Sequence, residues 1–296
     1  MSRDVLNKRQ SRFQRSARPT GMILQERDKR ILCACFECRY LTRSQVQQLF
    51  DIECVTRINL RLRKLWDHRF LDRRFLPTLS GSAEAVYLLG SHGVAIVAEK
   101  LGLDADEVLR HRALNLSIND SMLPHDLAVN DFRISVARQI GSDHRFQMKR
   151  WWDPRDCEQS FEILSEEKRI RTTLKPDGLL QLVFEDRLYS FFVELDQSTS
   201  GLSKLNDKYA AYAQFRALGL AEQAFKIQKF HLLIVAKSAD RCANLKTLAE
   251  QSDLDFIWLA NQNELKTDPL TSSVWYRTDQ AAVRSLFDKP KVRVVA

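Results

Sequence analysis

The chain has 296 residues, 44% of them hydrophobic, and a formal net charge of +8. It is long enough to bury two ordinary cores, and it contains neither an apolar run long enough to cross a bilayer nor a signal-like start. We therefore expect a cytoplasmic protein with no membrane contact, for which nucleic acid is the first partner to consider.

The first segment, residues 1–22, is strongly basic. It contains six Lys or Arg residues against one Asp and almost no periodic apolar residues, which predicts a flexible basic arm. Two interpretations of this arm stay open: a solubilising tail, or a segment that touches phosphates.

Residues 23–105 have the pattern helix, helix, helix, hairpin, helix. Apolar spacing predicts a helix from Ile23 to Tyr40, Thr42 caps a second helix, and Thr56 caps a third, "RINLRLRKLWDHRF". The segments "FLDRRFL" and "EAVYLL" then flank the turn-rich "PTLSGSA" and predict a hairpin. This order is typical of a winged helix-turn-helix, in which the third helix enters the major groove of double-stranded DNA.

The third helix separates an apolar face from a basic stripe, because its side chains advance about 100° per residue. The apolar face holds Ile58, Leu62, Leu65 and Trp66. The side chains expected to bind DNA are Arg57, Arg61, Lys64 and His68 on the stripe and Arg73 and Arg74 on the hairpin. Arg57 and Arg61 are suited to paired hydrogen bonds with guanine edges. Phosphate contacts are expected for Lys64, Arg73 and Arg74. The alternative is a solvated basic face on an ordinary helical bundle.

The second half predicts a mixed sheet. Residues 106–120 are expected to form a linker, and residues 121–265 read as helix, three strands, helix, strand, helix, strand. The charged stretch 153–172 is expected to be a loop or short insertion, and residues 266–296 a C-terminal extension. The whole chain is thus predicted to combine α+β and α/β elements in two domains.

Two carboxylates mark one edge of this predicted sheet. Asp177 lies at the start of one apolar strand and Glu194 at the end of the next. In an antiparallel hairpin the start of one strand adjoins the end of the other, so the two side chains should meet. Carboxylate oxygens are the ligands that Mg²⁺ prefers, and Mg²⁺ or Mn²⁺ held there would polarise a phosphodiester.

The pair Pro176-Asp177, followed by Glu194-Leu195-Asp196, resembles the motif of restriction-endonuclease-like domains of the PD-(D/E)XK type. Together with the predicted winged helix, the segments "LTRSQVQQLF", "LKPDGLL" and "FFVELDQST" make the chain similar to the replication-relaxation family of plasmid and mobile-element proteins. The resemblance implies a winged helix-turn-helix followed by an αβββαβ restriction-endonuclease-like domain. It also implies a role in replication, mobilisation or transcriptional control of a mobile genetic element, with replication or mobilisation proteins as partners.

The motif departs from the nuclease pattern at Asp196, where an active enzyme would carry lysine. A lysine from the following helix is the expected substitute, with Lys208 preferred and Lys204 second. An active site would then comprise Asp177, Glu194, Asp196 and Lys208, with Asp177 and Glu194 as metal ligands. Two structural alternatives remain: Asp196 and Ser198 cap the next helix, or the acidic groups pair with Lys208 or Lys175 as the remnant of an inactive nuclease.

Three hypotheses of function follow. The first is a non-catalytic DNA-binding regulator whose nuclease-like domain is degenerate, and the second is an Mg²⁺- or Mn²⁺-dependent DNA endonuclease. The third treats the second domain as a protein-interaction surface, for instance in a homodimer on palindromic half-sites. The sequence has no phosphate-binding loop and no zinc-protease histidine pair. The cluster Cys33, Cys35 and Cys38 is interpreted as buried core residues.

Overall fold

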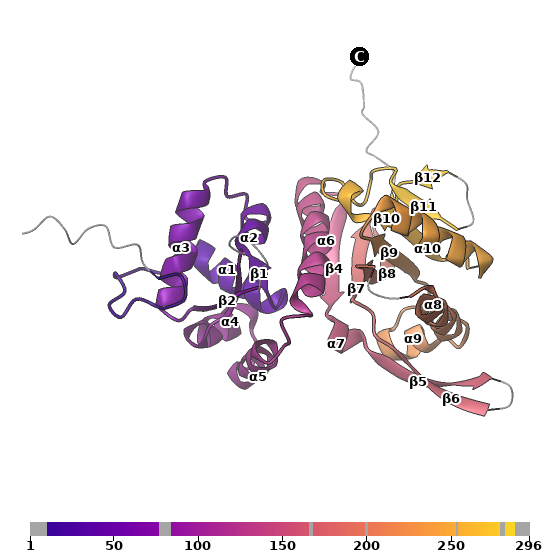
Figure 1. Ribbon diagram of the computed structural model, residues 1–296, viewed down its shortest axis with the longest axis horizontal. Coiled ribbons are helices and arrows are strands. Elements are labelled where there is room, and N and C mark those ends of the chain that lie inside the picture. The colour runs from indigo at the N-terminus through magenta and orange to yellow at the C-terminus, as the bar shows by residue number, and fades with distance from the viewer. Residues whose placement is uncertain are drawn as a thin grey trace, which may run out of the picture. The chain divides into compact units, whose positions relative to one another are not determined.

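The computed structural model describes residues 11–76, 84–165, 168–198, 201–252, 254–278 and 282–287. Its contacts divide the chain into two compact units, Met1–Asn130 and Asp131–Ala296, and the division falls within helix α6 (Leu123–Ser142) (Figure 1). No helix within these described ranges combines the length and apolar character needed to cross a bilayer.

The first unit contains five helices that precede α6 and a small antiparallel sheet with the strand order β1-β3-β2. The helices are α1 (Glu26–Glu37), α2 (Arg43–Leu49), α3 (Val55–Asp67), α4 (Val94–Leu101) and α5 (Ala105–Leu116). The strands are β1 (Leu41–Thr42), β2 (Leu71–Phe75) and β3 (Ala85–Leu89). The predicted order of three helices, a hairpin and a further helix is observed, although the predicted hairpin tip lies outside the described residues. Residues 106–120, expected as a linker, lie mostly in α5.

Amphipathic spacing explains why these helices form one core. Ile58, Leu62 and Leu65 of α3 are at most 2% exposed and face the interior. The cysteines of the first helix region, Cys33, Cys35 and Cys38, are also buried. Burial of each such apolar side chain contributes roughly 1.5–3 kcal/mol, so the apolar face of α3 fixes which of its side chains point outward.

The second unit is built on a seven-stranded sheet with the order β12-β11-β10-β9-β8-β7-β4. Strands β8, β9 and β10 are parallel to one another and the other pairs are antiparallel. The strands are β4 (Phe146–Trp152), β7 (Gly178–Phe184), β8 (Arg187–Asp196), β9 (His231–Ala236), β10 (Ile257–Asn261), β11 (Trp275–Arg277) and β12 (Val283–Arg284). The helices after α6 are α7 (Pro154–Cys157), α8 (Leu202–Ala217), α9 (Leu220–Phe225) and α10 (Ala239–Gln251).

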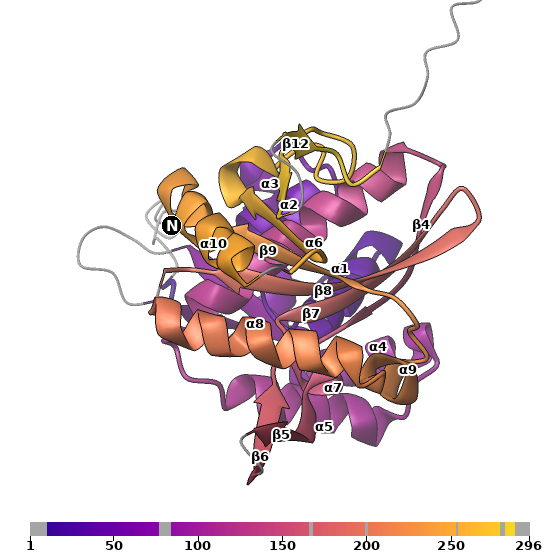
Figure 2. The ribbon, with the colours of Figure 1, turned by 90° about the vertical axis from the view of Figure 1, so that its right-hand side faces the viewer.

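Helices cover both faces of this sheet. Figure 2 shows α8 and α10 on one face and α6 on the other. The central strands are therefore buried on both faces: all six residues of β8 from Phe191 to Asp196 are buried, including the carboxylates Glu194 and Asp196, as are five of the six in β9. Phe192 of β8 packs edge-on against Phe230 and Phe215, with centroid distances of 4.8 and 5.9 Å. The predicted mixed sheet with flanking helices is confirmed at this level.

Residues 153–172, expected as a loop or short insertion, form an insertion with regular secondary structure and not a loop. This stretch contains α7 and most of a two-stranded hairpin, β5 (Gln159–Ser165) with β6 (Lys168–Leu174), which forms a sheet of its own (Figure 1). Charged residues obscure the strand alternation of this stretch. Phe161 and Ile163 share one face of β5, whereas Glu162 lies on the other. At the base of the hairpin the Phe161 ring lies 5.5 Å from that of Phe215, which attaches it to the core.

Residues 266–296 were expected as an extension, but their described part completes the sheet. Trp275 of β11 is fully buried, and its indole donates to the carbonyl of Pro269 at 2.7 Å. Gln139 of α6 donates to Thr271 Oγ1 at 2.7 Å and accepts from the Leu270 N–H at 2.8 Å. These buried hydrogen bonds make the segment part of the second unit.

Candidate functional site

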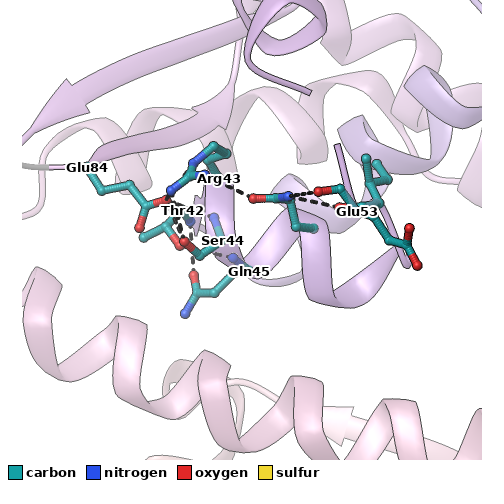
Figure 3. A network of polar contacts seen from close by, with 8 residues as sticks. Thr42, Arg43, Ser44, Gln45, Glu53 and Glu84 are labelled. Carbon is teal, nitrogen blue, oxygen red and sulfur yellow. Dashed lines mark hydrogen bonds and ion pairs between the residues drawn. The ribbon is translucent and has the colours of Figure 1, made fainter. Parts of the chain in front are cut away.

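The entry to α3 is fixed by a polar network around the start of α2 (Figure 3). Thr42 and Gln45 form a reciprocal capping box at the first turn of α2. Glu84, just before β3, accepts from the Ser44 N–H at 2.9 Å and from Arg43 Nε at 3.1 Å. Gln47 then donates to the carbonyl of Ile52 at 2.9 Å, in the turn that leads to α3. The side chains thus tie α2, the α2–α3 turn and the hairpin together.

The outward face of α3 carries two basic residues and one apolar residue. Arg57 is exposed, Leu60 is 62% exposed, and Lys64 is half-buried near the end of the helix. Sequence reasoning placed Arg57 and Lys64 on this face but missed Leu60. It could have been found as the position opposite the apolar sector, whereas the prediction followed the basic residues alone.

Arg61 does not belong to this outward set. Its Nε donates to Asp28 Oδ1 at 2.7 Å. Its Nη2 pairs with Asp28 Oδ2 and also donates to the carbonyl of Ile23 at 2.8 Å. Asp28 is 1% exposed and accepts the Gln25 N–H at the start of α1. The hydrogen bonds to Asp28 raise the pKa of Arg61. Arg61 therefore joins α3 to α1 and neutralises a buried carboxylate.

The other three predicted DNA contacts also donate to the chain itself. His68 Nε2 lies 2.9 Å from the carbonyl oxygen of Thr20. Arg73 lies over the Trp66 ring, 3.6 Å from its centroid, and donates to the carbonyl of Arg12. Arg74 donates to the carbonyls of Leu116 and Ile118.

Residues 11–20, the described end of the expected flexible arm, are held against α3 and β2. Arg63 donates to the carbonyls of Ser11 at 2.6 Å and Gln14 at 3.0 Å. Arg15 pairs with Asp72 at 2.6 Å, and the Ser16 N–H donates to Asp67. Composition does not indicate this docking, because the segment has no apolar periodicity and several of the contacts involve main-chain groups.

In the second unit, strand register brings the predicted acidic groups together. Gly178 of β7 pairs with Val193 of β8, and the Asp177 N–H donates to the Val193 carbonyl at 3.0 Å. The Leu195 N–H in turn donates to Asp177 Oδ2 at 2.7 Å. Asp177 therefore lies beside the strand residue Glu194, close enough for its charge to raise the pKa of that carboxyl.

Glu194 is 8% exposed and has two partners from α8. Lys208 forms an ion pair with Oε2, and the Tyr212 hydroxyl donates to Oε1 at 2.6 Å. Burial raises the pKa of Glu194 to about 7; Lys208 opposes the shift and Asp177 adds to it. Burial lowers the pKa of Lys208, but Glu194 and Asp177 outweigh it and the net shift is upward. The predicted lysine thus reaches the site, and Tyr212, one turn later, was missed as a ligand of Glu194.

Asp196 is held by an arginine that the sequence did not indicate. Arg241 of α10 donates Nε to Oδ1 at 2.8 Å and Nη2 to Oδ2 at 3.0 Å, a bidentate pair. The Ser198 N–H also donates to Asp196 Oδ1, at 2.9 Å. The helix that follows takes Gly201 as its N-cap, so Asp196 does not cap it. Lys204 is exposed and Lys175 pairs with Glu158 at 3.2 Å.

These contacts do not suit a divalent cation. Both oxygens of Glu194 and both of Asp196 already accept from protein donors, and one oxygen of Asp177 accepts from a main-chain N–H. Within the described ranges no group of three or more His, Cys, Asp or Glu side chains is arranged to hold a metal ion. The arrangement is that of buried carboxylates neutralised by Lys208 and Arg241.

A family model described as replication-relaxation matches residues 35–228, more than half of the chain. The match runs from the end of α1 through α9 and includes both α3 and the strands that carry Asp177 and Glu194. No curated protein and no solved structure matches the chain significantly.

Proposed function

The chain belongs to the replication-relaxation family, and on this premise we propose that it is a double-stranded DNA-binding protein of a plasmid or other mobile genetic element. The family points to replication or mobilisation of such an element, and transcriptional control is the related alternative. We assign DNA contact to residues 23–105 as a winged helix-turn-helix, and a restriction-endonuclease-like core to residues 121–265.

The outward face of α3 carries the proposal. Arg57, Leu60 and Lys64 lie on it, and an exposed arginine is suited to guanine edges in the major groove. The exposed Leu60 side chain suits contact with a thymine methyl group. The network in Figure 3 holds the preceding helix and turn, so the face is presented by a rigid support.

The double variant Arg57→Glu/Lys64→Glu tests this assignment. We expect its dissociation constant for random-sequence duplex DNA to rise about tenfold or more, because two phosphate- or base-contacting cations become repulsive. Fluorescence anisotropy with a labelled duplex measures the change. Arg61 is left intact, since its pair with buried Asp28 would confuse loss of binding with loss of fold.

The matched control is Lys229→Glu, a charge reversal at an exposed residue of the second unit. It should bind duplex DNA as the parent does, within about twofold, and circular dichroism should show that all variants fold. Parent-like binding by the double variant would contradict the assignment of α3 to the DNA interface.

We further propose that the acidic cluster of the second unit is structural. Its carboxylates are satisfied by Lys208, Tyr212 and Arg241, so they join β8 to α8 and α10 in place of holding a catalytic ion. A buried carboxylate without such partners would be costly, and removal of one partner of a buried pair typically costs about 3–5 kcal/mol. The nuclease-like domain then serves as a rigid body or a protein-interaction surface, the latter in a homodimer or with replication or mobilisation proteins.

A metal-dependent DNA endonuclease is the second candidate. One observation favours it: Asp177 lies close enough to Glu194 and Lys208 for its charge to raise the pKa of both groups. Supercoiled plasmid incubated with the protein and Mn²⁺ or Mg²⁺ separates the two proposals. A structural cluster predicts no nicking with either ion. Nicking by the parent that is lost in Asp177→Ala, and kept in the Lys229→Glu control, would establish the enzyme and overturn the structural assignment.

A further inference from the structure

One surface of the first unit interleaves arginine and aromatic side chains from three segments. Trp66 of α3 has Arg73 over its ring at 3.6 Å, Arg63 at 4.7 Å and Arg15 at 5.0 Å from the ring centroid. Further along, the Phe75 ring of β2 is contacted by an arginine and a phenylalanine of the N-terminal segment. Arg12 lies 4.2 Å from its centroid and Phe13 meets it edge-on at 5.2 Å.

The N-terminal segment is an integral part of this surface. Arg63 and Arg73 donate to the carbonyls of Ser11, Gln14 and Arg12. These bonds place Phe13 with its side chain 70% exposed, at the edge of the surface rather than in the core. An exposed phenylalanine held in place by neighbouring main-chain bonds offers a free ring face at little cost in entropy.

An open pocket of about 590 Å³ adjoins this ring. Its lining combines rings, guanidinium groups, an amide and a carboxylate, from Phe13, Phe75, Arg73, Arg74, Asn119 and Asp120, with Trp66 and Ile118 completing the wall. Arg73 Nε is buried and makes no hydrogen bond to the part of the chain that the structure describes. A buried donor of this kind is stabilised by any ligand that brings an acceptor to it.

We propose that this pocket binds one unpaired nucleotide of single-stranded DNA, with the base stacked on Phe13 and the phosphate beside Arg73. The inference rests on the proposed DNA-binding function and deepens it, because it gives the first unit a second, chemically different DNA site beside α3. Alternating aromatic and arginine side chains are the usual means of holding single strands, since every base has a face that can stack.

The chemistry of the lining favours a nucleotide over a purely apolar ligand. The volume falls in the range of pockets that enclose small molecules, and the polar groups are of three kinds. The guanidinium of Arg73 suits a phosphate, the Asn119 amide suits the edge of a base, and the Asp120 carboxylate suits an exocyclic amino group. A base inside a duplex is stacked on both faces, so only an unpaired base can present one to Phe13.

The consequence is a protein that holds duplex and single strand together. The outward face of α3 would bind duplex DNA, and the Phe13 pocket would bind a nucleotide of a strand that has been separated from its complement. Such a pair of sites suits DNA that is opened locally during replication or mobilisation.

Phe13→Ala tests the pocket, measured by anisotropy with a labelled oligothymidylate and, separately, with a labelled duplex. We expect about tenfold weaker binding of the oligothymidylate, from the loss of one stacked base, and duplex binding within about twofold of the parent. The control variant Leu109→Ala removes another exposed apolar side chain of the same unit and should change neither. Phe13→Trp keeps a stacking ring, should bind the oligothymidylate like the parent, and adds a fluorophore that a stacked base quenches.

A second probe isolates stacking from phosphate contact. Oligothymidylate in which abasic sites replace every base keeps its phosphates, so it should bind the parent about as weakly as the intact strand binds Phe13→Ala. Oligothymidylate affinity unchanged by Phe13→Ala, or an equal loss on both the single strand and the duplex, would overturn the inference. Neither result decides the proposal that α3 binds duplex DNA, which the variant Arg57→Glu/Lys64→Glu tests. The pocket proposal and the duplex proposal can therefore fail separately.

Discussion

Arginine residues of α3 and β2 that look equivalent in the sequence have different partners in the fold. Arg57 faces outward, Arg61 neutralises the buried carboxylate of Asp28, and Arg73 covers a tryptophan ring. The roles of these arginines differ because different groups lie opposite their side chains. A guanidinium beside a buried carboxylate is stabilised more by pairing with it than by solvation. A charge on a helix therefore indicates a DNA contact only after its neighbours within the protein have been accounted for.

Glu194 gives a residue-scale prediction of pH dependence. In the unfolded chain it loses its proton near its ordinary pKa of 4.5, whereas in the folded protein burial raises the pKa to about 7. Between these values the folded state binds more protons, so the free energy of unfolding falls as the pH rises. We expect the parent to lose about 1–3 kcal/mol more than Glu194→Gln between pH 4.5 and 7.5.

Urea unfolding followed by tryptophan fluorescence measures this difference, since four of the five tryptophans lie in the second unit: Trp151, Trp152, Trp258 and Trp275. An exposed glutamate substituted in the same way, Glu99→Gln, should keep the pH dependence of the parent. Equal pH dependence in the parent and in Glu194→Gln would show that Glu194 titrates normally in the folded protein.

At the scale of elements, the helices and strands that could be predicted from the sequence are those whose apolar residues are regularly spaced. The helix α3 and the strands β7 and β8 were predictable, because their apolar residues follow a period of 3.6 or run continuously. The meeting of Asp177 with Glu194 then followed from antiparallel pairing alone. The hairpin β5–β6 was missed because charged residues obscure its alternation.

Two further features had no local signal at all. Residues 11–20 dock partly through carbonyl groups, which every residue carries, and the arginine and phenylalanine side chains that also take part follow no apolar period. Arg241, the partner of Asp196, is brought near by the packing of α10 on the sheet, which is a tertiary effect. Long-range pairing of this kind is decided by topology and cannot be derived from spacing along the chain.

The C-terminal segment supplies the element-scale prediction. Phe287 is 6% exposed, and its ring lies 4.7 Å from that of Phe184 and 4.9 Å from that of Tyr189. We expect Phe287→Ala to lower the free energy of unfolding by about 3 kcal/mol, through lost burial and a cavity beside the sheet. Urea denaturation measures the loss.

The same substitution at the exposed Phe13, Phe13→Ala, serves as the control and should change stability by about 0.5 kcal/mol or less. A change of less than about 1 kcal/mol in Phe287→Ala would contradict the placement of the C-terminal segment on the sheet.

At the scale of the whole molecule, the net charge of +8 would govern the encounter with DNA in the proposed function. Such an excess attracts a polyanion over several ångströms and is screened by salt, so it speeds association without selecting a sequence. In that proposal, selectivity comes from the few side chains at the surface of α3 that are assigned to base edges. The proposed DNA affinity therefore has two contributions: the electrostatic attraction of the whole molecule and the contacts that side chains of α3 make with DNA.

A salt titration separates these parts. We expect duplex affinity to fall steeply between about 50 and about 200 mM salt, and we expect Arg57→Gln/Lys64→Gln to reduce the slope of log K against log salt by about 1, for the lost phosphate contact of Lys64. Lys229→Gln is the control and should keep the parental slope. A parental slope in the double variant would place its two side chains away from the phosphates.

The irregularity in β4 bears on how this protein behaves at high concentration. As the last strand of the seven-stranded sheet, β4 has a register shift between Met148 and Arg150, and Gln147, Lys149 and Arg150 are exposed around it. A straight border strand is a template on which another molecule can add its own strand, and a bulge flanked by cations removes that template. We therefore expect this irregularity to hinder strand addition between molecules, a contribution to colloidal stability that is separate from any contact with DNA.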